Sequence, residues 1–66
     1  MKKDEFKKLW RRATKDKIDV TIELKGSMLL YVTRCSFSKF FEGLIFLYTG
    51  EERIGYIQLK AVKEVY

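Results

Sequence analysis

The first part of the chain repeats its apolar positions with the period of an α-helix. Four of them fall at i, i+3, i+4 and i+7: Phe6, Leu9, Trp10 and Ala13. Because these positions share one stripe of a helix and the rest are mostly charged, the pattern predicts an amphipathic helix over residues 4–15. Asp4 stands where a side-chain oxygen can cap the first free N–H groups. Trp10, on the apolar stripe, is interpreted as a packing anchor.

From Ile18 onward, the period changes to two, which is typical of a half-buried strand. Residues 18–24 alternate apolar and polar side chains, and Lys25-Gly26-Ser27 predicts a tight turn after them. Runs rich in β-branched and aromatic residues predict four further strands, at 28–35, 44–48, 53–58 and 59–65. In the last run the apolar residues are spaced by three, which indicates a tight bend before a brief strand.

This order of elements predicts an α+β fold that is mostly β. A helix followed by five short strands suits a helix that caps a five-stranded, strongly bent antiparallel small barrel. The chain has no proline, repeat or linker, so residues 1–66 are interpreted as a single domain. A chain this short buries only about 60% of its unfolded surface, and a small barrel leaves open edges. Pairing of those edges between copies, in a ring, is therefore expected.

One stretch, RCSFSKFFEG at residues 34–43, fits neither period. It carries Phe37, Phe40 and Phe41 within five positions, with Lys39 among them. Rings that stack on unpaired bases, beside cations that hold phosphates, are typical of proteins that bind single-stranded nucleic acid. Burial of all three rings in the core explains the pattern equally well. If Lys39 faces outward, alternation places Phe37 and Phe40 on opposite sides, so only one of them is expected to meet a ligand.

The net charge of +5 comes entirely from the N-terminal part of the chain. Residues 1–17 hold eight Lys and Arg against three acids, whereas the remaining residues are neutral overall. A concentrated basic element favours an anionic partner such as RNA, DNA or an acidic membrane surface. A solvated helix face with no partner is the alternative.

Composition excludes several kinds of chemistry. The chain has no His and a single Cys, Cys35, so neither a metal-ligand set nor a disulfide within the chain is expected. No cofactor or catalytic activity is expected either, since Glu51 and Glu52 are adjacent on a turn and would point apart. The lone thiol, the lack of a run of about 20 apolar residues and the lack of a signal peptide together predict a cytoplasmic location.

Three segments of the chain resemble the Sm-like RNA-binding proteins, in particular the Hfq-like branch. They are the strand and turn KIDVTIELKG, the segment SFSKF, and the closing IQLKAVKEVY. In SFSKF, Ser36, Phe37 and Phe40 match the family, while Ser38 stands where the family usually has Asp. The resemblance implies a non-catalytic protein that binds single-stranded RNA as a ring-shaped homo-oligomer.

The resemblance also implies two groups of RNA-binding residues. In an inner-pore site, Phe37 would be the stacking ring, with Phe40 in the core. Gln58 would offer an amide to a base edge, and Lys39 and Lys60 would reach phosphates. A second group would form a basic rim on the helix: Lys8, Arg11, Arg12 and Lys15.

Other interpretations remain open from the sequence. A different small barrel of the SH3-like kind fits the same strand pattern. The segment GLIFLY, followed by the IQLKAVKEV ending, also resembles pleckstrin-homology domains. For either fold, the alternative function is a protein- or membrane-interaction module whose basic helix docks on an acidic partner.

Overall fold

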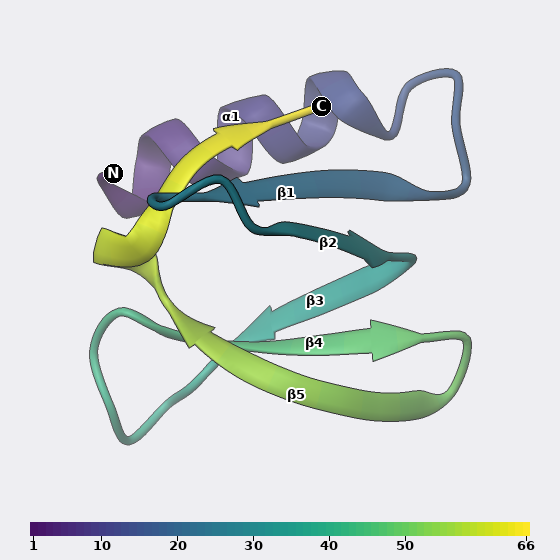
Figure 1. Ribbon diagram of the computed structural model, residues 1–66. Coiled ribbons are helices and arrows are strands. Elements are labelled where there is room, and N and C mark those ends of the chain that lie inside the picture. Colours follow the sequence, from purple (N-terminus) through teal and green to yellow (C-terminus); the bar gives the residue numbers. More distant parts are fainter.

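The computed structural model, which describes residues 1–66, contains one α-helix, six strands and a short 3₁₀ turn (Figure 1). These elements are α1 (Lys3–Ala13), β1 (Val20–Leu24), β2 (Leu29–Val32), β3 (Arg34–Phe37), β4 (Leu44–Thr49), β5 (Glu52–Gln58), η1 (Leu59–Ala61) and β6 (Val62–Val65). The predicted class, α+β and mostly β, is confirmed. No helix is both long and apolar enough to cross a membrane.

The strands form two antiparallel sheets of three strands each, in the orders β2-β1-β6 and β3-β4-β5. The predicted five-stranded barrel is therefore wrong in strand number and in closure. The extra strand arises because the strand predicted over 28–35 is interrupted at Thr33, between β2 and β3. The Thr33 N–H and hydroxyl both donate to the Tyr48 carbonyl, at 2.9 and 3.3 Å. These bonds tie the bend to β4, where the chain passes from the first sheet to the second.

Two turns have the local geometry that the sequence predicts. Between β1 and β2, Gly26 and Ser27 both have positive φ, 94° and 72°, as a tight hairpin turn with a matching twist requires. Between β5 and β6, η1 makes the tight bend predicted within residues 59–65, and Leu59 within it is buried. This bend returns the chain from the second sheet to the first.

The helix lies along β6 and closes the core on that side (Figure 1). Phe6 and Ala13 are buried and Leu9 and Trp10 are half-buried, so the predicted apolar stripe is confirmed. The helix begins at Lys3, so Asp4 lies in its first turn and the predicted cap at Asp4 is wrong.

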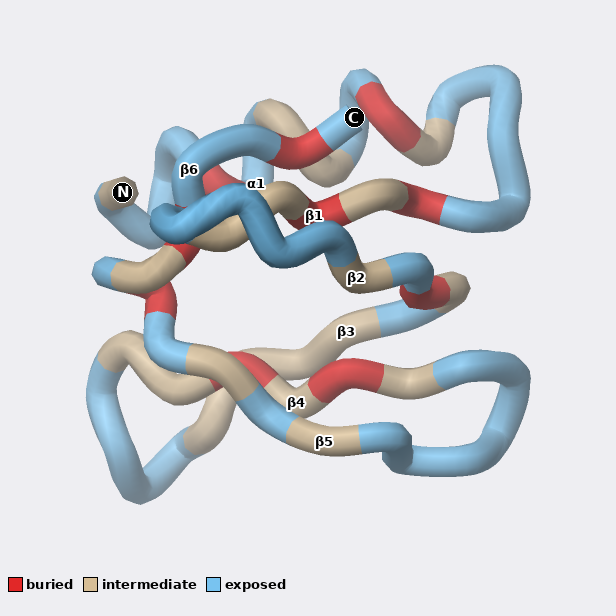
Figure 2. Tube along the Cα trace, in the orientation of Figure 1, coloured by how far each residue is buried: buried red, intermediate tan, exposed pale blue.

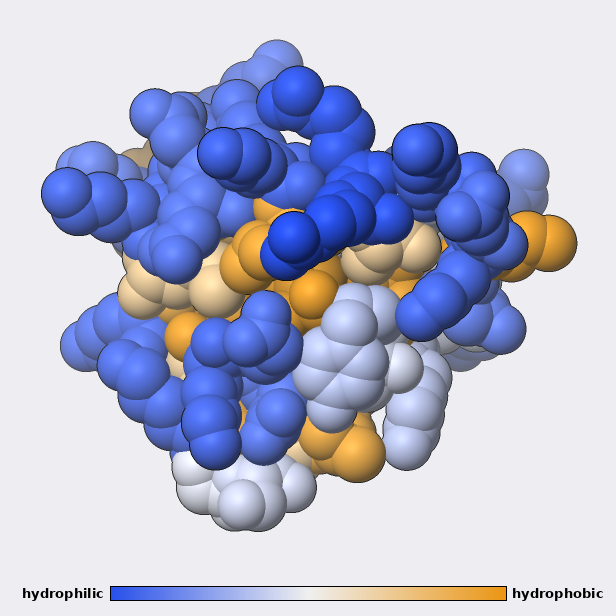
Figure 3. All heavy atoms as spheres, turned by 90° about the horizontal axis from the view of Figure 1, so that it is seen from above, coloured by the Kyte–Doolittle hydropathy of each residue, from blue (hydrophilic) through white to orange (hydrophobic).

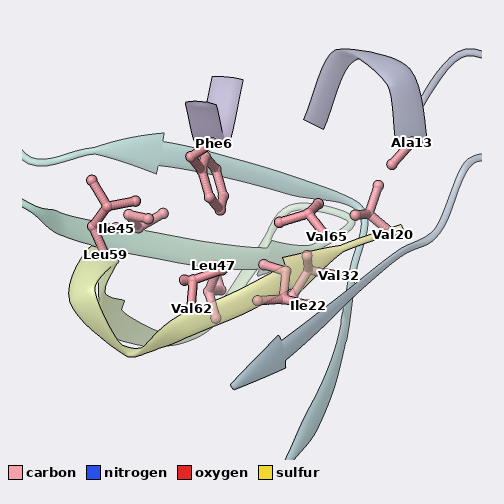
Figure 4. Packing of buried hydrophobic residues seen from close by; sticks show 10 residues of the cluster. All are labelled: Phe6, Ala13, Val20, Ile22, Val32, Ile45, Leu47, Leu59, Val62 and Val65. Carbon is pink, nitrogen blue, oxygen red and sulfur yellow. The ribbon is translucent and has the colours of Figure 1, made fainter. Parts of the chain in front are cut away.

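Ten buried side chains form one hydrophobic cluster between the helix and the two sheets (Figures 2 and 4). Phe6 points from the helix toward the strand residues, and it is the largest fully buried side chain. Its ring packs edge-to-face on Phe37 of β3, with centroids 5.7 Å apart, and stacks on Trp10 at 6.1 Å. Phe6 therefore joins the helix to the second sheet. The cluster comprises Phe6, Ala13, Val20, Ile22, Val32, Ile45, Leu47, Leu59, Val62 and Val65.

Candidate functional site

A hollow of about 1280 Å³ lies at one end of the molecule. Its walls are the loop between β3 and β4, the end of β5, η1 and the N-terminus, which Figure 1 shows on the same side. The loop between β3 and β4 lies beside the end of β5 because the three strands are hydrogen-bonded in the order β3-β4-β5. Segments from both ends and from the middle of the chain thus converge on one concave surface.

The four residues predicted for an inner site all line this hollow: Phe37, Lys39, Gln58 and Lys60. Strand register explains why they meet. Phe37 pairs with Ile45 and Ile45 pairs with Ile57, so the end of β3 is level with the end of β5. The side chains of Lys39, Gln58 and Lys60 are exposed, whereas Phe37 is half-buried.

The structure contradicts the predicted burial of Phe40, while Phe37 is half-buried at the edge of the core. Phe37 packs on Phe6, and the ammonium groups of Lys3 and Lys7 lie 4.8 and 5.6 Å from its ring centroid. Phe40, predicted to be in the core, is 91% exposed. The placement of Phe40 in the core comes from the resemblance to Sm-like proteins. The expectation from alternation, that only one of the two rings is free to meet a ligand, agrees with a half-buried Phe37 and an exposed Phe40.

The loop that carries the exposed rings, residues 38–43, has a defined hydrogen-bonding pattern. The Ser38 hydroxyl accepts bonds from the N–H groups of Phe40 and Phe41, at 3.1 and 3.0 Å. The Ser38 N–H donates to the Leu44 carbonyl at 2.9 Å, and the Leu44 N–H donates to the Phe41 carbonyl at 3.2 Å. These bonds fix the backbone on both sides of the two rings. Phe41 is also exposed, at 68%, so the loop presents two adjacent aromatic side chains to solvent.

Several further residues of the hollow were missed by the sequence reasoning. Tyr56 and Phe46 add aromatic surface from β5 and β4, and Lys2 and Lys3 add charge from the N-terminus. The period of two in β5 does contain a signal for Tyr56, because it lies two residues before Gln58 and so shares a strand face with that predicted site residue. Nothing local places the N-terminal lysines at this end of the sheet.

The hollow carries a strong excess of positive charge. Four lysines line it, Lys2, Lys3, Lys39 and Lys60, against one carboxylate, Glu42. The structure contains one ion pair, between Lys63 and Glu23 at 3.6 Å, which lies outside this site. The four ammonium groups are therefore not neutralised by carboxylates, and a concave surface of one sign attracts anions.

The predicted basic rim lies apart from the hollow; Lys8, Arg11 and Arg12 are on α1, whereas Lys15 follows the end of the helix. Lys8, Arg11, Arg12 and Lys15 are all exposed and none of them lines the hollow. Viewed from above the helix, the molecule is covered mostly by hydrophilic side chains (Figure 3). Arg11 also borders a smaller cleft of about 260 Å³ in which Phe37 forms another wall. The structure thus places the two predicted groups on different surfaces that meet near Phe37.

Cys35 lies in the smaller cleft and is half-buried. Burial raises the pKa of its thiol to about 11, so the thiol stays protonated and weakly nucleophilic near neutral pH. No group of three or more His, Cys, Asp or Glu side chains is placed to hold a metal ion.

Searches against protein-family models, curated proteins and solved structures give no match to this chain.

Proposed function

We propose that this protein is a non-catalytic, single-stranded RNA-binding protein of the Sm-like type that works as a homo-oligomeric ring in the cytoplasm. The observation that carries the proposal is the hollow, where exposed aromatic rings stand among four lysines that have no acidic partner. Aromatic stacking on bases together with cations that follow phosphates is how proteins hold single strands without reading a fixed sequence.

In this proposal each side chain of the hollow has a distinct role. Phe40 stacks on an unpaired base, because its ring is almost fully exposed on a backbone that Ser38 holds in place. Lys39 and Lys60 contact the phosphates on either side, and the Gln58 amide meets a base edge. A duplex would be excluded, because its bases already stack on each other and present no free face to the ring.

The basic rim on α1 would hold the RNA backbone outside the hollow. Replacing both Arg11 and Arg12 with Ala should weaken RNA binding and reduce the slope of log K against log salt by roughly one to two units. The reason is that each lost phosphate contact releases about one counterion fewer. Fluorescence anisotropy titrations at several salt concentrations measure this slope.

A matched control is the double replacement of Lys17 and Lys25 with Ala, which removes the same charge from exposed, unpaired positions elsewhere. If the two double variants have the same slope and affinity, the helix makes no specific contact with RNA.

Open strand edges support the proposed ring. Each sheet has two edge strands, so β5 in one sheet and β6 in the other each have a neighbour on one side only. Pairing of β5 in one copy with β6 in the next would satisfy both edges and repeat around a closed ring. Stability would then depend on concentration. Dilution over about a hundredfold range should lower the melting temperature by several degrees. A constant melting temperature, with the mass of a monomer in solution, would contradict the ring.

The alternative is an interaction module whose basic helix docks on an acidic protein or membrane. The observation that favours it is the exposed, unpaired row of cations on α1. The two functions differ in which surface matters: docking through the helix would need Arg11 and Arg12 but not Phe40.

A further inference from the structure

The outer face of the β3-β4-β5 sheet presents aromatic side chains in ordered rows. Ile45 and Leu47 of β4 are buried in the core, so Phe46 and Tyr48, which alternate with them, point to the other face. Register then builds two rows across the three strands. One consists of Arg34, Tyr48 and Arg53, and the next of Ser36, Phe46 and Tyr56.

No element of the chain covers this face. The helix and the β2-β1-β6 sheet both lie on the opposite side, which the core fills (Figure 1). Tyr56 is 68% exposed, and the neighbouring bulge leaves Ile54 48% exposed. The face is therefore an uncovered aromatic sheet surface rather than part of the core.

Each arginine of the first row lies over an aromatic ring. The Arg34 guanidinium carbon is 4.0 Å from the Tyr48 ring centroid, and that of Arg53 is 5.1 Å from the Phe46 centroid. Neither arginine forms an ion pair, and no carboxylate belongs to either row. Stacked guanidinium groups without an acidic partner retain their hydrogen-bond donors for a ligand.

We propose that this face is a second track for unpaired nucleotides, which leads away from the hollow along β4 and β5. The inference rests on the proposed RNA binding and names a second surface for it. The two surfaces are continuous, because Phe46 and Tyr56 line the hollow as well as the second row. A strand of RNA that leaves the hollow would pass Tyr56 first and then reach the arginine row. Successive rows are roughly 7 Å apart, two residues along each strand.

Charge and shape favour RNA over other occupants of the face. An acidic peptide would satisfy the two arginines, but it offers no flat groups for a surface built of three aromatic rings. A second copy of the chain would bring the same two cations against themselves, which like-charge repulsion disfavours. Planar bases joined by an anionic backbone complement both features at once.

The test compares short and long single-stranded RNA on the wild-type protein and on two double variants. The probes are labelled oligouridylates of about five and about fifteen nucleotides, since single-strand sites in small β-proteins span roughly 4–16 nucleotides. One variant carries Arg34→Gln and Arg53→Gln. The control carries Lys17→Gln and Lys25→Gln, two exposed lysines without an ion pair, which removes the same charge from other surfaces.

The arginine variant should bind the long probe about tenfold more weakly and the short probe within about twofold of wild type. The control should change both affinities equally and by less. A further variant, Tyr48→Leu, keeps an apolar side chain but removes the ring, and it too should weaken only the long probe.

Equal affinity of the arginine variant and the control for the long probe would overturn the second track while leaving RNA binding in place. A wild-type protein that binds neither probe would overturn both. If the arginine variant instead changes the oligomeric mass and not the RNA affinity, the face contacts another copy and the second track is again overturned.

Discussion

Replacing Phe6 with Ala is expected to remove a large part of the protein's stability. Phe6 is fully buried, and its ring joins the helix to Phe37 of the second sheet. Emptying a buried Phe position costs about 3–5 kcal/mol. A domain of this size has a total stability of roughly 3–10 kcal/mol, at about 0.05–0.15 kcal/mol per residue. Urea denaturation followed by circular dichroism measures the free energy of unfolding of both proteins.

The matched control for this experiment is Phe41→Ala, which removes an identical side chain from an exposed position. It should change the free energy of unfolding by less than about 0.5 kcal/mol. Equal losses for the two variants would mean that the loop rings belong to the core and that the packing around Phe6 is wrong.

Replacing Phe40 with Ala is expected to give the largest loss of RNA affinity for a single substitution. Loss of one stacked ring costs about 1–3 kcal/mol, or roughly five- to 150-fold in Kd. Stability should change little because the ring has almost no contact with the rest of the protein. Anisotropy titrations with a labelled oligouridylate, together with urea denaturation, measure both effects.

Ile18→Ala is a suitable control for Phe40→Ala. Ile18 is an exposed apolar residue, at 82%, and it does not line the hollow. Ile18→Ala should change neither the RNA affinity nor the free energy of unfolding by a measurable amount. If the Phe40→Ala protein keeps its RNA affinity but loses several kcal/mol of stability, the Phe40 ring is buried in the core, as the resemblance to Sm-like proteins implies.

The sequence predicts the secondary structure well where one period holds over a whole element. The helix stripe and β1 follow from spacing, and β4 and β5 follow from their β-branched and aromatic residues. The first strand begins at Val20, two residues later than predicted, and Ile18 is exposed. The break at Thr33 has no such signal. Residues 28–35 are apolar on both faces near their middle, and the bend depends on bonds to Tyr48, which lies fifteen residues further along the chain.

The sequence predicts four residues that line the hollow but not which aromatic rings are exposed. The residues Phe37, Lys39, Gln58 and Lys60 do come together, because strand register aligns the ends of β3 and β5. The placement of Phe40 in the core, which the resemblance to Sm-like proteins implies, is wrong because β3 ends at Phe37 and Phe40 lies in the loop that follows. The bonds to the Ser38 hydroxyl that shape the loop involve backbone groups, which no pattern of side chains reveals.

The distribution of the N-terminal positive charge is also only partly predictable from the sequence. The excess of cations in residues 1–17 is visible by counting. The sequence does not show that these cations lie on two different surfaces. Lys2 and Lys3 line the hollow, whereas Arg12 and Lys15 do not. That division depends on where the helix begins and on how it lies along β6.

The most direct test of the proposed RNA binding is a titration of the ¹⁵N-labelled protein with a single-stranded oligouridylate, followed by amide chemical shifts. We expect saturable shifts concentrated at residues 38–43 and 56–60 and at the N-terminus, with smaller shifts along α1. A matching RNA duplex should cause little change at the hollow. Shifts confined to other surfaces, or none at protein and RNA concentrations of about 1 mM, above the roughly 10⁻⁴–10⁻⁶ M dissociation constants of sequence-independent binding, would contradict the proposal.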